Sequence, residues 1–269
     1  MHQWQEFNQS FKKYCIETLK NKLSGLDKIY EICVYPFEVS GKFFRPFLLY
    51  KTAEFIDSNK TESMLPFCLA LELIHNYSLI HDDLPCMDNA DFRRGFPTVH
   101  KKFGEAEAVL AGDMLLTLAF EIISSCSGFQ PEKIVKVIKK VSQYSSYRYL
   151  ITGQYLDLWF QKGIVQKNLE NIKLINFYKT SGLIMLAVEI PIILLDPLYS
   201  IKFKLVKYGY WLGILFQVTD DILDNDGIVE IVSIEEARDI ASKIYNKIRS
   251  LELSQDLLEI ANFVYSRGF

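Results

Sequence analysis

The stretch His81-Asp82-Asp83-Leu84-Pro85-Cys86-Met87-Asp88 closes a strongly apolar run, and Arg93 and Arg94 follow it. It places three carboxylates within seven residues. Residues 65–83 are apolar on nearly all sides, which predicts a helix buried by its neighbours. Pro85 ends or distorts that helix, because proline lacks an N–H and disfavours helical geometry at the residue before it. The sequence therefore predicts a buried helix with clustered acids at its carboxyl end.

A second acidic stretch, Gln217-Val218-Thr219-Asp220-Asp221-Ile222-Leu223-Asp224, also follows an apolar run. At about 3.6 residues per turn, one stripe of a helix would carry Gln217, Asp220, Asp221 and Asp224. A solvated acidic face is the alternative interpretation. Mg²⁺ is held by one or two carboxylates plus substrate phosphate oxygens, and bound Mg²⁺ inverts a field that would otherwise repel a diphosphate. Two such clusters facing one another predict a site of this kind.

Local basic residues can complete an anion site. Arg93 and Arg94 follow the first acidic stretch, Lys42 and Arg45 lie beside Gly41, and Lys179 precedes Thr180. Arginine matches a phosphate with two parallel hydrogen bonds, whereas lysine acts as a point charge. Each pair alone is as well explained by a solvated surface. Their occurrence together with two acidic stretches favours phosphate binding.

Composition excludes several classes of protein. The chain has 269 residues, 49% of them hydrophobic, and a net charge of −3, so no global basic field attracts nucleic acid. The five cysteines include no CxxC pair, which argues against a disulfide framework or a zinc site and fits a reducing compartment. The N-terminus lacks the features of a signal peptide, and no apolar run reaches about 18 uncharged residues. We expect a soluble, cytoplasmic protein without a membrane span.

Helical periodicity dominates the whole chain, and alternation typical of strands is absent. We find no repeat, low-complexity tract or linker that would divide it, so residues 1–269 are expected to form a single all-helical domain. The predicted helices occupy residues 4–22, 45–56, 65–83, 106–123, 131–141, 170–195, 203–224 and, as one or two helices, 233–266.

Taken together, these motifs resemble the short-chain trans-prenyl diphosphate synthases, especially the bacterial farnesyl diphosphate synthases. The matching segments lie in the family's order over residues 38–226: Gly41-Lys42-Phe43-Phe44-Arg45-Pro46, His75-Asn76-Tyr77-Ser78-Leu79-Ile80 with the acidic stretch that follows, Arg93-Arg94-Gly95, Phe103-Gly104-Glu105-Ala106, Ala111-Gly112-Asp113, Gly153-Gln154-Tyr155-Leu156-Asp157, Lys179-Thr180 and Phe216 through Asp224.

The resemblance implies an all-α, isoprenoid synthase-type bundle of about ten or more helices around a deep central cavity, and a homodimer. It implies an Mg²⁺-dependent prenyltransferase that condenses dimethylallyl or geranyl diphosphate with isopentenyl diphosphate to give farnesyl diphosphate. Three Mg²⁺ ions would be held mainly by Asp82, Asp88 and Asp220 and supported by Asp83, Asp221 and Asp224. The allylic diphosphate would contact Arg93, Lys179, Thr180 and Gln217, and isopentenyl diphosphate would contact Lys42, Arg45, His75 and Arg94.

Product length is expected to depend on Tyr77, with Ser78 beside it. Tyr77 lies five residues before Asp82, about 7–8 Å along a helix axis, where its ring would form the floor of the cavity. An ordinary core aromatic is the alternative. The spacing from Asp83 to Asp88, two residues longer than in a DDxxD motif, also resembles the bacterial farnesyl type.

Two departures from the family pattern bear on activity. Phe43 stands where bacterial members often carry arginine. Asp224-Asn225-Asp226-Gly227 runs directly into Ile228 without the basic, Gly-rich, lysine-bearing loop that closes over the allylic diphosphate in the family. A geranyl or geranylgeranyl diphosphate synthase, a class I terpene cyclase and a weakly active regulatory subunit are the alternative functions. The missing loop favours the last of these, and the retained aspartates argue against it.

Overall fold

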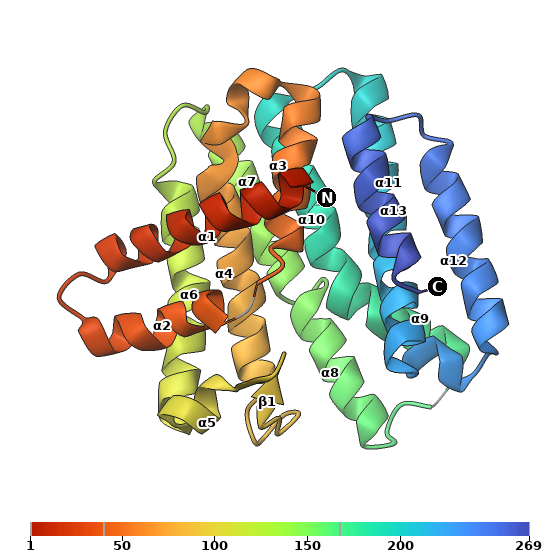
Figure 1. The fold of residues 1–269 in the computed structure, drawn as a ribbon, viewed down its shortest axis with the longest axis horizontal. Coiled ribbons are helices and arrows are strands. Elements are labelled where there is room, and N and C mark those ends of the chain that lie inside the picture. Colours follow the sequence, from red (N-terminus) through yellow and green to blue (C-terminus); the bar gives the residue numbers. More distant parts are fainter. Residues whose placement is uncertain (1, 40, 167, 269) are drawn as a thin grey trace. The chain divides into compact units, whose positions relative to one another are not determined.

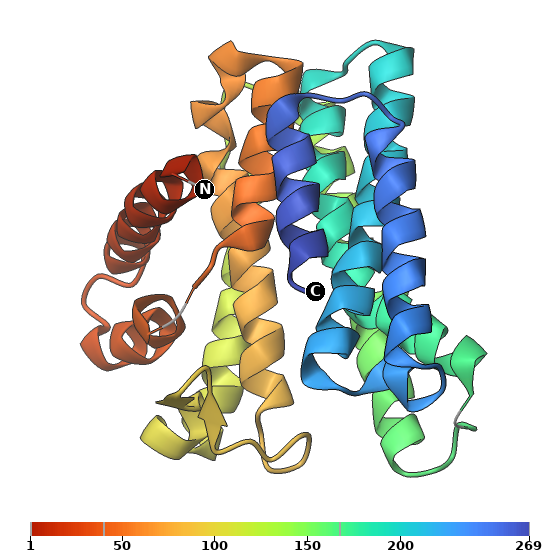
Figure 2. The same ribbon diagram turned by 45° about the vertical axis from the view of Figure 1, so that its right-hand side comes forward.

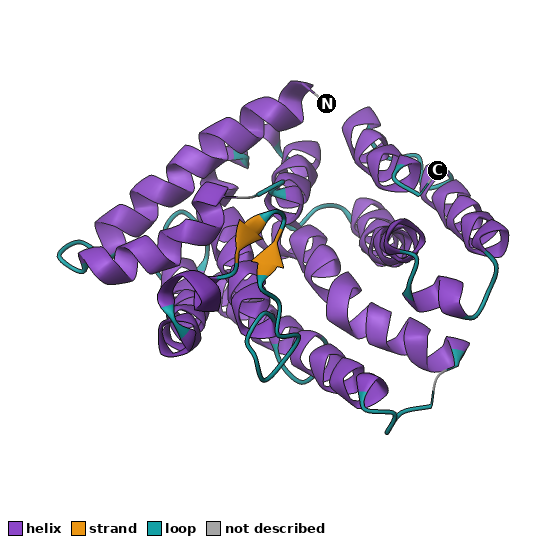
Figure 3. Cartoon of the chain, turned by 60° about the horizontal axis from the view of Figure 1, so that its bottom comes forward, coloured by secondary structure: helices purple, strands orange, loops and turns teal. Residues whose placement is uncertain are grey.

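The computed structural model describes residues 2–39, 41–166 and 168–268, and almost all of its regular structure is helical (Figure 3). The predicted all-α class is confirmed. The described chain forms two compact units, residues 1–47 with 65–128 and residues 48–64 with 129–269. The expectation of a single domain stays a prediction.

The first unit is built on two long helices that pack side by side, α4 and α6 (Figure 1). Gly112 lets them approach closely, because a Cβ atom there would lie 2.1 Å from the Nε2 atom of His81. A helical hairpin of α1 and α2 joins this pair through the packing of α2 on α6 (Figure 2). The elements of this unit are α1 (His2–Lys22), α2 (Asp27–Val39), the start of α3 (Phe44–Ile56), α4 (Leu65–Asp82), β1 (Phe92–Arg93), β2 (Phe96–Pro97), α5 (Val99–Phe103) and α6 (Glu105–Ser124).

The second unit is organised around α11, which contacts α10, α12 and α13. Tyr208 is fully buried in α11, and its hydroxyl donates to the carbonyl of Leu257 at 2.7 Å, which ties α11 to α13. The elements are the end of α3, two short 3₁₀ helices η1 (Ser58–Lys60) and η2 (Glu62–Met64), α7 (Pro131–Ser145), α8 (Leu150–Gln161), α9 (Leu169–Asn176), the π-helix η3 (Phe177–Ser181), α10 (Gly182–Leu195), α11 (Tyr199–Asp224), the 3₁₀ helix η4 (Gly227–Glu230), α12 (Ile234–Arg249) and α13 (Gln255–Ser266).

The helix predicted over 170–195 contains a π-helical turn that periodicity did not reveal. Residues 177–181 form η3, between α9 and α10. A π-turn occurs within an otherwise continuous helix, so the spacing of apolar residues does not predict it. This turn carries Lys179 and Thr180, two of the predicted site residues.

Among the described residues, two helical stretches have the length and hydropathy of a membrane-spanning helix, Glu62–Asp82 and Glu170–Leu195. The expectation of no membrane span was based only on runs without charged residues. The 18-residue windows within these two stretches contain up to two charged residues. Most of each window is buried inside the protein, 72% and 61%. Core helices of a bundle have the same length and composition. These properties alone therefore do not distinguish a core helix from a membrane-spanning helix.

Candidate functional site

The first acidic stretch folds back on the end of α4. The helix ends at Asp82, and the Leu84 N–H donates to the carbonyl of His81 at 3.2 Å. Past Pro85 the chain reverses, and the Asp88 N–H donates to the carbonyl of Asp82 at 2.9 Å. Asp82 is buried and Asp88 is exposed. The distortion expected at Pro85 thus brings the backbones of two predicted metal ligands together.

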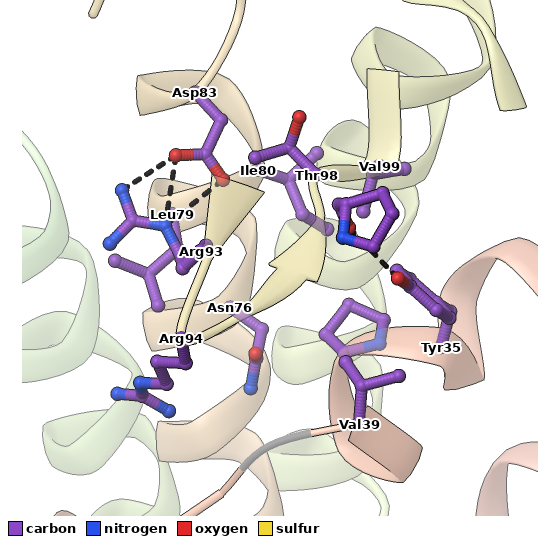
Figure 4. Close-up of a pocket in the computed structure, with 12 residues that line it drawn as sticks. Tyr35, Val39, Asn76, Leu79, Ile80, Asp83, Arg93, Arg94, Thr98 and Val99 are labelled. Atoms are coloured by element: carbon purple, nitrogen blue, oxygen red, sulfur yellow. Dashed lines mark hydrogen bonds and ion pairs between the residues drawn. The ribbon is translucent and has the colours of Figure 1, made fainter. Parts of the chain in front are cut away.

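Asp83 pairs with Arg93, which the sequence predicts to bind the allylic diphosphate (Figure 4). Asp83 is 3% exposed and accepts three hydrogen bonds from Arg93, two from Nε at 2.8 and 3.0 Å and one from Nη2 at 2.6 Å. Arg93 is held in β1, whose turn to β2 consists of Arg94 and Gly95, both with positive φ. Such φ angles are those of a two-residue hairpin turn, which favours glycine. The Arg-Arg-Gly sequence therefore fixes the direction of the Arg93 guanidinium.

Arg45 and His75, both half-buried, and the buried Glu72 interact electrostatically in the same unit. The Arg45 Nη1 atom lies 3.2 Å from His75 Nε2. Burial, together with the charges of Arg45 and Arg94, lowers the pKa of His75, so its neutral ring can accept this hydrogen bond. Burial raises the pKa of Glu72 to about 7 despite the opposing charges of Arg45 and Arg94. No role was assigned to Glu72 from the sequence.

Lys42 and Phe43 precede Arg45 in the sequence. The Lys42 side chain is exposed, and its carbonyl accepts from the Trp4 indole at 2.7 Å. Phe43, the departure noted above, is buried with φ of 43° and packs edge-on against Phe11 at 5.2 Å between ring centroids. An apolar ring thus completes the core at the position where the family often carries arginine.

A small cavity of about 40 Å³ lies beside the Asp83–Arg93 pair (Figure 4). Asn76, Arg93 and Arg94 supply its basic and polar wall. A space of this size accommodates water rather than a diphosphate.

The floor role of Tyr77 stays a prediction, and the structure describes the surroundings of this residue. It is buried in α4, and its ring packs edge-on against the ring of His81 at 5.9 Å between centroids. Burial raises the pKa of the Tyr77 hydroxyl to about 12. The Ser78 hydroxyl donates to the carbonyl of His75 at 2.8 Å. Both residues therefore belong to the last turns of the helix that carries Asp82.

In the second unit, Asp221 is the most thoroughly bound carboxylate of its stretch. It accepts hydrogen bonds from Gln217 Nε2 at 2.6 Å, from Asn176 Nδ2 at 2.8 Å and from the Ile228 N–H at 2.9 Å. Burial raises its pKa to about 6. The Ile228 contact comes from η4, which follows the stretch directly where relatives of the bacterial type were expected to have a basic loop.

The other aspartates of this stretch have different surroundings. Asp220 is half-buried and forms an ion pair with Arg267, whose guanidinium also lies 4.6 Å from the centre of the Phe216 ring. Asp224 is exposed at the end of α11. Arg267 lies far along the sequence from any motif, so only the packing of the C-terminal segment reveals it.

Lys179 is oriented by a carboxylate from α8. Its Nζ atom lies 2.6 Å from Oδ2 of Asp157, and Thr180 follows it in the π-helix. Gly153, one turn before Asp157, lets the two segments meet, because a Cβ atom there would lie 2.4 Å from the Lys179 backbone nitrogen. Asp157 was part of the quoted Gly-Gln-x-x-Asp segment, but its pairing with Lys179 was not predicted.

The predicted ligands are divided between the two units. The first unit contains Asp82, Asp83, Asp88 and the residues predicted to bind isopentenyl diphosphate, and the second contains Asp220, Asp221, Asp224 and Lys179. Within the described ranges, no three His, Cys, Asp or Glu side chains converge into a metal-binding group. The donors are nevertheless the carboxylate oxygens that Mg²⁺ prefers, and Mg²⁺ needs only one or two of them when phosphate oxygens complete its shell.

Comparison with known proteins identifies the family. The family model for polyprenyl synthetases matches residues 26–249. The chain is 37% identical to geranylgeranyl pyrophosphate synthase 9, chloroplastic, of Arabidopsis thaliana, over 93% of this chain and 73% of that protein.

Solved bacterial structures have the same fold. An FPP/GFPP synthase from Zymomonas mobilis superposes with a TM-score of 0.89 at 30% identity and covers 98% of this chain and 99% of that one. A geranyltransferase from Helicobacter pylori, complexed with magnesium and isoprenyl diphosphate, gives 0.77 at 29% identity over 96% of both chains. The chain therefore belongs to the polyprenyl synthetase family and is a prenyltransferase of the trans-prenyl diphosphate synthase type.

Proposed function

We propose that this prenyltransferase condenses dimethylallyl or geranyl diphosphate with isopentenyl diphosphate to form farnesyl diphosphate. The observation that carries the proposal is the pair of aspartate stretches, each at the carboxyl end of a helix, together with an oriented cation in each unit. Asp83 orients Arg93 in one unit, and Asp157 orients Lys179 in the other. Residues of this kind suit a diphosphate that arrives with divalent metal.

The metal in this proposal is Mg²⁺, three ions in all, held mainly by Asp82, Asp88 and Asp220. When bound, Mg²⁺ neutralises charge that develops on the departing diphosphate. Asp83 and Asp221 support these ligands through the hydrogen bonds that fix Arg93 and Gln217. Asp224 is exposed and would bind Mg²⁺ through a water molecule.

The remaining residues bind and orient the two substrates. Arg93, Lys179, Thr180 and Gln217 hold the allylic diphosphate, while Lys42, Arg45, His75 and Arg94 hold isopentenyl diphosphate. Cations on the leaving diphosphate lower the barrier to breaking the allylic C–O bond. The isopentenyl double bond then attacks the allylic carbon, and the departed diphosphate accepts the proton that is lost.

One assay tests this function against its alternatives. The purified chain is incubated with Mg²⁺, isopentenyl diphosphate and geranyl diphosphate, and the products are identified by chromatography and mass spectrometry. Farnesyl diphosphate is the expected product. A cyclic hydrocarbon made from geranyl diphosphate alone would indicate a terpene cyclase, and absence of turnover would indicate a regulatory subunit.

Geranylgeranyl diphosphate is the second candidate product, because the plant relatives carry that name. Tyr77 supports farnesyl diphosphate in this proposal, because a buried ring one and a half turns before Asp82 would limit the length of the growing chain. We expect Tyr77→Ala to lengthen the main product, measured with radiolabelled isopentenyl diphosphate. Tyr14→Ala, an aromatic substitution in α1, serves as the control. An unchanged product in Tyr77→Ala would show that Tyr77 does not form the floor of the product cavity.

We also propose a homodimer located in the cytoplasm. Exposed apolar side chains such as Leu110, which is 67% exposed on α6, suit an interface between copies. All five cysteines are free thiols in the described chain, which suits a reducing compartment. Light scattering after size-exclusion chromatography would show twice the chain mass. Cell fractionation would place the protein with cytoplasmic markers, whereas the Arabidopsis relative is named as chloroplastic.

A further inference from the structure

A cavity of about 400 Å³ lies in the second unit behind the second acidic stretch. Its walls come from α9, the π-helix η3, α11, η4 and α12. This volume is within the range of small-molecule sites, roughly 300–1,000 Å³. It is ten times the space beside the Asp83–Arg93 pair.

The wall is largely apolar. Side chains from separate elements contribute, including Phe177 of η3, Ile214 and Val218 of α11 and Ile240 of α12. Ligand sites usually combine a wall of this kind with a few converging polar groups. The π-helix is a further sign, because π-turns occur frequently at functional sites.

One buried polar atom in this wall has no partner in the described part of the chain. Ser181 is fully buried and lines the cavity, and its Oγ atom makes no hydrogen bond there. Leaving a buried hydroxyl unpaired costs about 1–3 kcal/mol. Most serines at helical positions avoid this cost by donating to the carbonyl of a preceding turn. A ligand in the cavity with one hydrogen-bonding group would satisfy Ser181.

The charged and amide groups around the cavity define the class of ligand. Asp221 already accepts three hydrogen bonds, so its carboxylate has little capacity left for a ligand. Glu170 and Lys173 are exposed and carry opposite charges, so their charges offset one another for a molecule inside. Asp221 leaves one negative charge on the wall, which disfavours an anion, and its oxygens already accept from protein donors. A neutral molecule therefore fits this wall.

The cavity shares only Gln217 and Asp221 with the residues assigned to diphosphate binding and metal binding. Asp220, Asp224 and Lys179 do not line it. We propose that this cavity is a second ligand site, which binds a neutral, largely apolar molecule through one hydrogen bond to Ser181. This inference goes beyond prenyl transfer and does not depend on the identity of the product.

Binding of 1-naphthol and of naphthalene to the full chain, measured by isothermal titration calorimetry without Mg²⁺ or diphosphate, tests the proposal. The two probes share an apolar ring system, and only 1-naphthol carries a hydroxyl. We expect 1-naphthol to bind about fivefold more tightly than naphthalene, the effect of one neutral hydrogen bond. Ser181→Ala should remove this difference and leave the affinity for naphthalene unchanged.

Variants of α12 locate the site. Ile240→Trp fills the cavity and should weaken both probes at least tenfold, whereas Ile234→Trp, on the same helix outside the cavity wall, should not. Thermal melts followed by circular dichroism check folding, and Ile240→Phe replaces Ile240→Trp if the latter does not fold. Unchanged binding in the filled, folded variant, or a retained preference for 1-naphthol in Ser181→Ala, would overturn the proposal. Neither outcome bears on turnover, so the proposed function is tested separately.

Discussion

At Glu72, burial and two guanidinium groups act on the pKa in opposite directions. Burial dominates and raises the pKa from 4.5 to about 7, while Arg45 and Arg94 oppose the rise. Between these pH values the folded protein retains a proton that the unfolded chain has released. The free energy of unfolding therefore falls as pH rises from 4.5 to about 7 and becomes independent of this group above that pH, a difference of about 3 kcal/mol.

We predict that Glu72→Gln removes most of this dependence. Urea denaturation of both proteins at pH 5 and pH 8 measures it, and the variant should lose less stability on going to pH 8 than the parent does. Asp221, whose pKa is also raised, to about 6, is present in both proteins, so its contribution cancels in the difference. Parallel pH profiles for the two proteins would contradict the assignment.

Asp83 and Arg93 supply a second prediction at the scale of single residues. The carboxylate is buried and accepts three hydrogen bonds from one guanidinium. Asp83→Asn keeps the shape but removes the charge, so it should lower the free energy of unfolding by about 1–2 kcal/mol and reduce kcat by misdirecting Arg93. Asp91→Asn, which loses only an exposed pair with Lys101, is the matched control and should change stability by less than about 0.5 kcal/mol.

At the scale of elements, the contact of α8 with the π-helix depends on one glycine. A Cβ atom at Gly153 would lie 2.4 Å from the backbone nitrogen of Lys179, so backbone must shift to accommodate it. We predict that Gly153→Ala lowers the free energy of unfolding by about 1–3 kcal/mol and reduces turnover by displacing Lys179 from Asp157. Gln161→Ala, at the end of α8, is the control. Wild-type turnover in Gly153→Ala would show that this spacing is not needed.

Element boundaries illustrate where local pattern is sufficient. The run predicted over 65–83 is α4, Leu65–Asp82, because Pro85 removes a helical donor and constrains the residue before it. The run predicted over 106–123 is α6, Glu105–Ser124. The π-turn at Lys179 escaped detection, since its backbone depends on how α8 and α11 pack against it.

At the scale of the whole molecule, the proposed function requires the two aspartate stretches to act on one diphosphate. Residues that act as a unit have strongly non-additive effects on rate. We predict that Asp82→Ala and Asp220→Asn each reduce kcat by at least about a thousandfold while the far-ultraviolet circular dichroism is unchanged. The double variant should be no slower than the slower single variant. Effects on ln kcat that simply add would contradict a shared metal site.

The sequence by itself determined the all-α class and helices such as α1, α4, α6 and α11, because periodicity and proline positions are local properties of the chain. It did not predict α2, α5 or α8, and the chemistry of the two acidic stretches stays a prediction from carboxylate spacing. Tertiary structure decided which cation each carboxylate binds: Arg93 on Asp83, Lys179 on Asp157 and Arg267 on Asp220. These pairs are separated by 10, 22 and 47 residues. Their formation, like the cavity beside Ser181, depends on how separate elements pack, which no local pattern specifies.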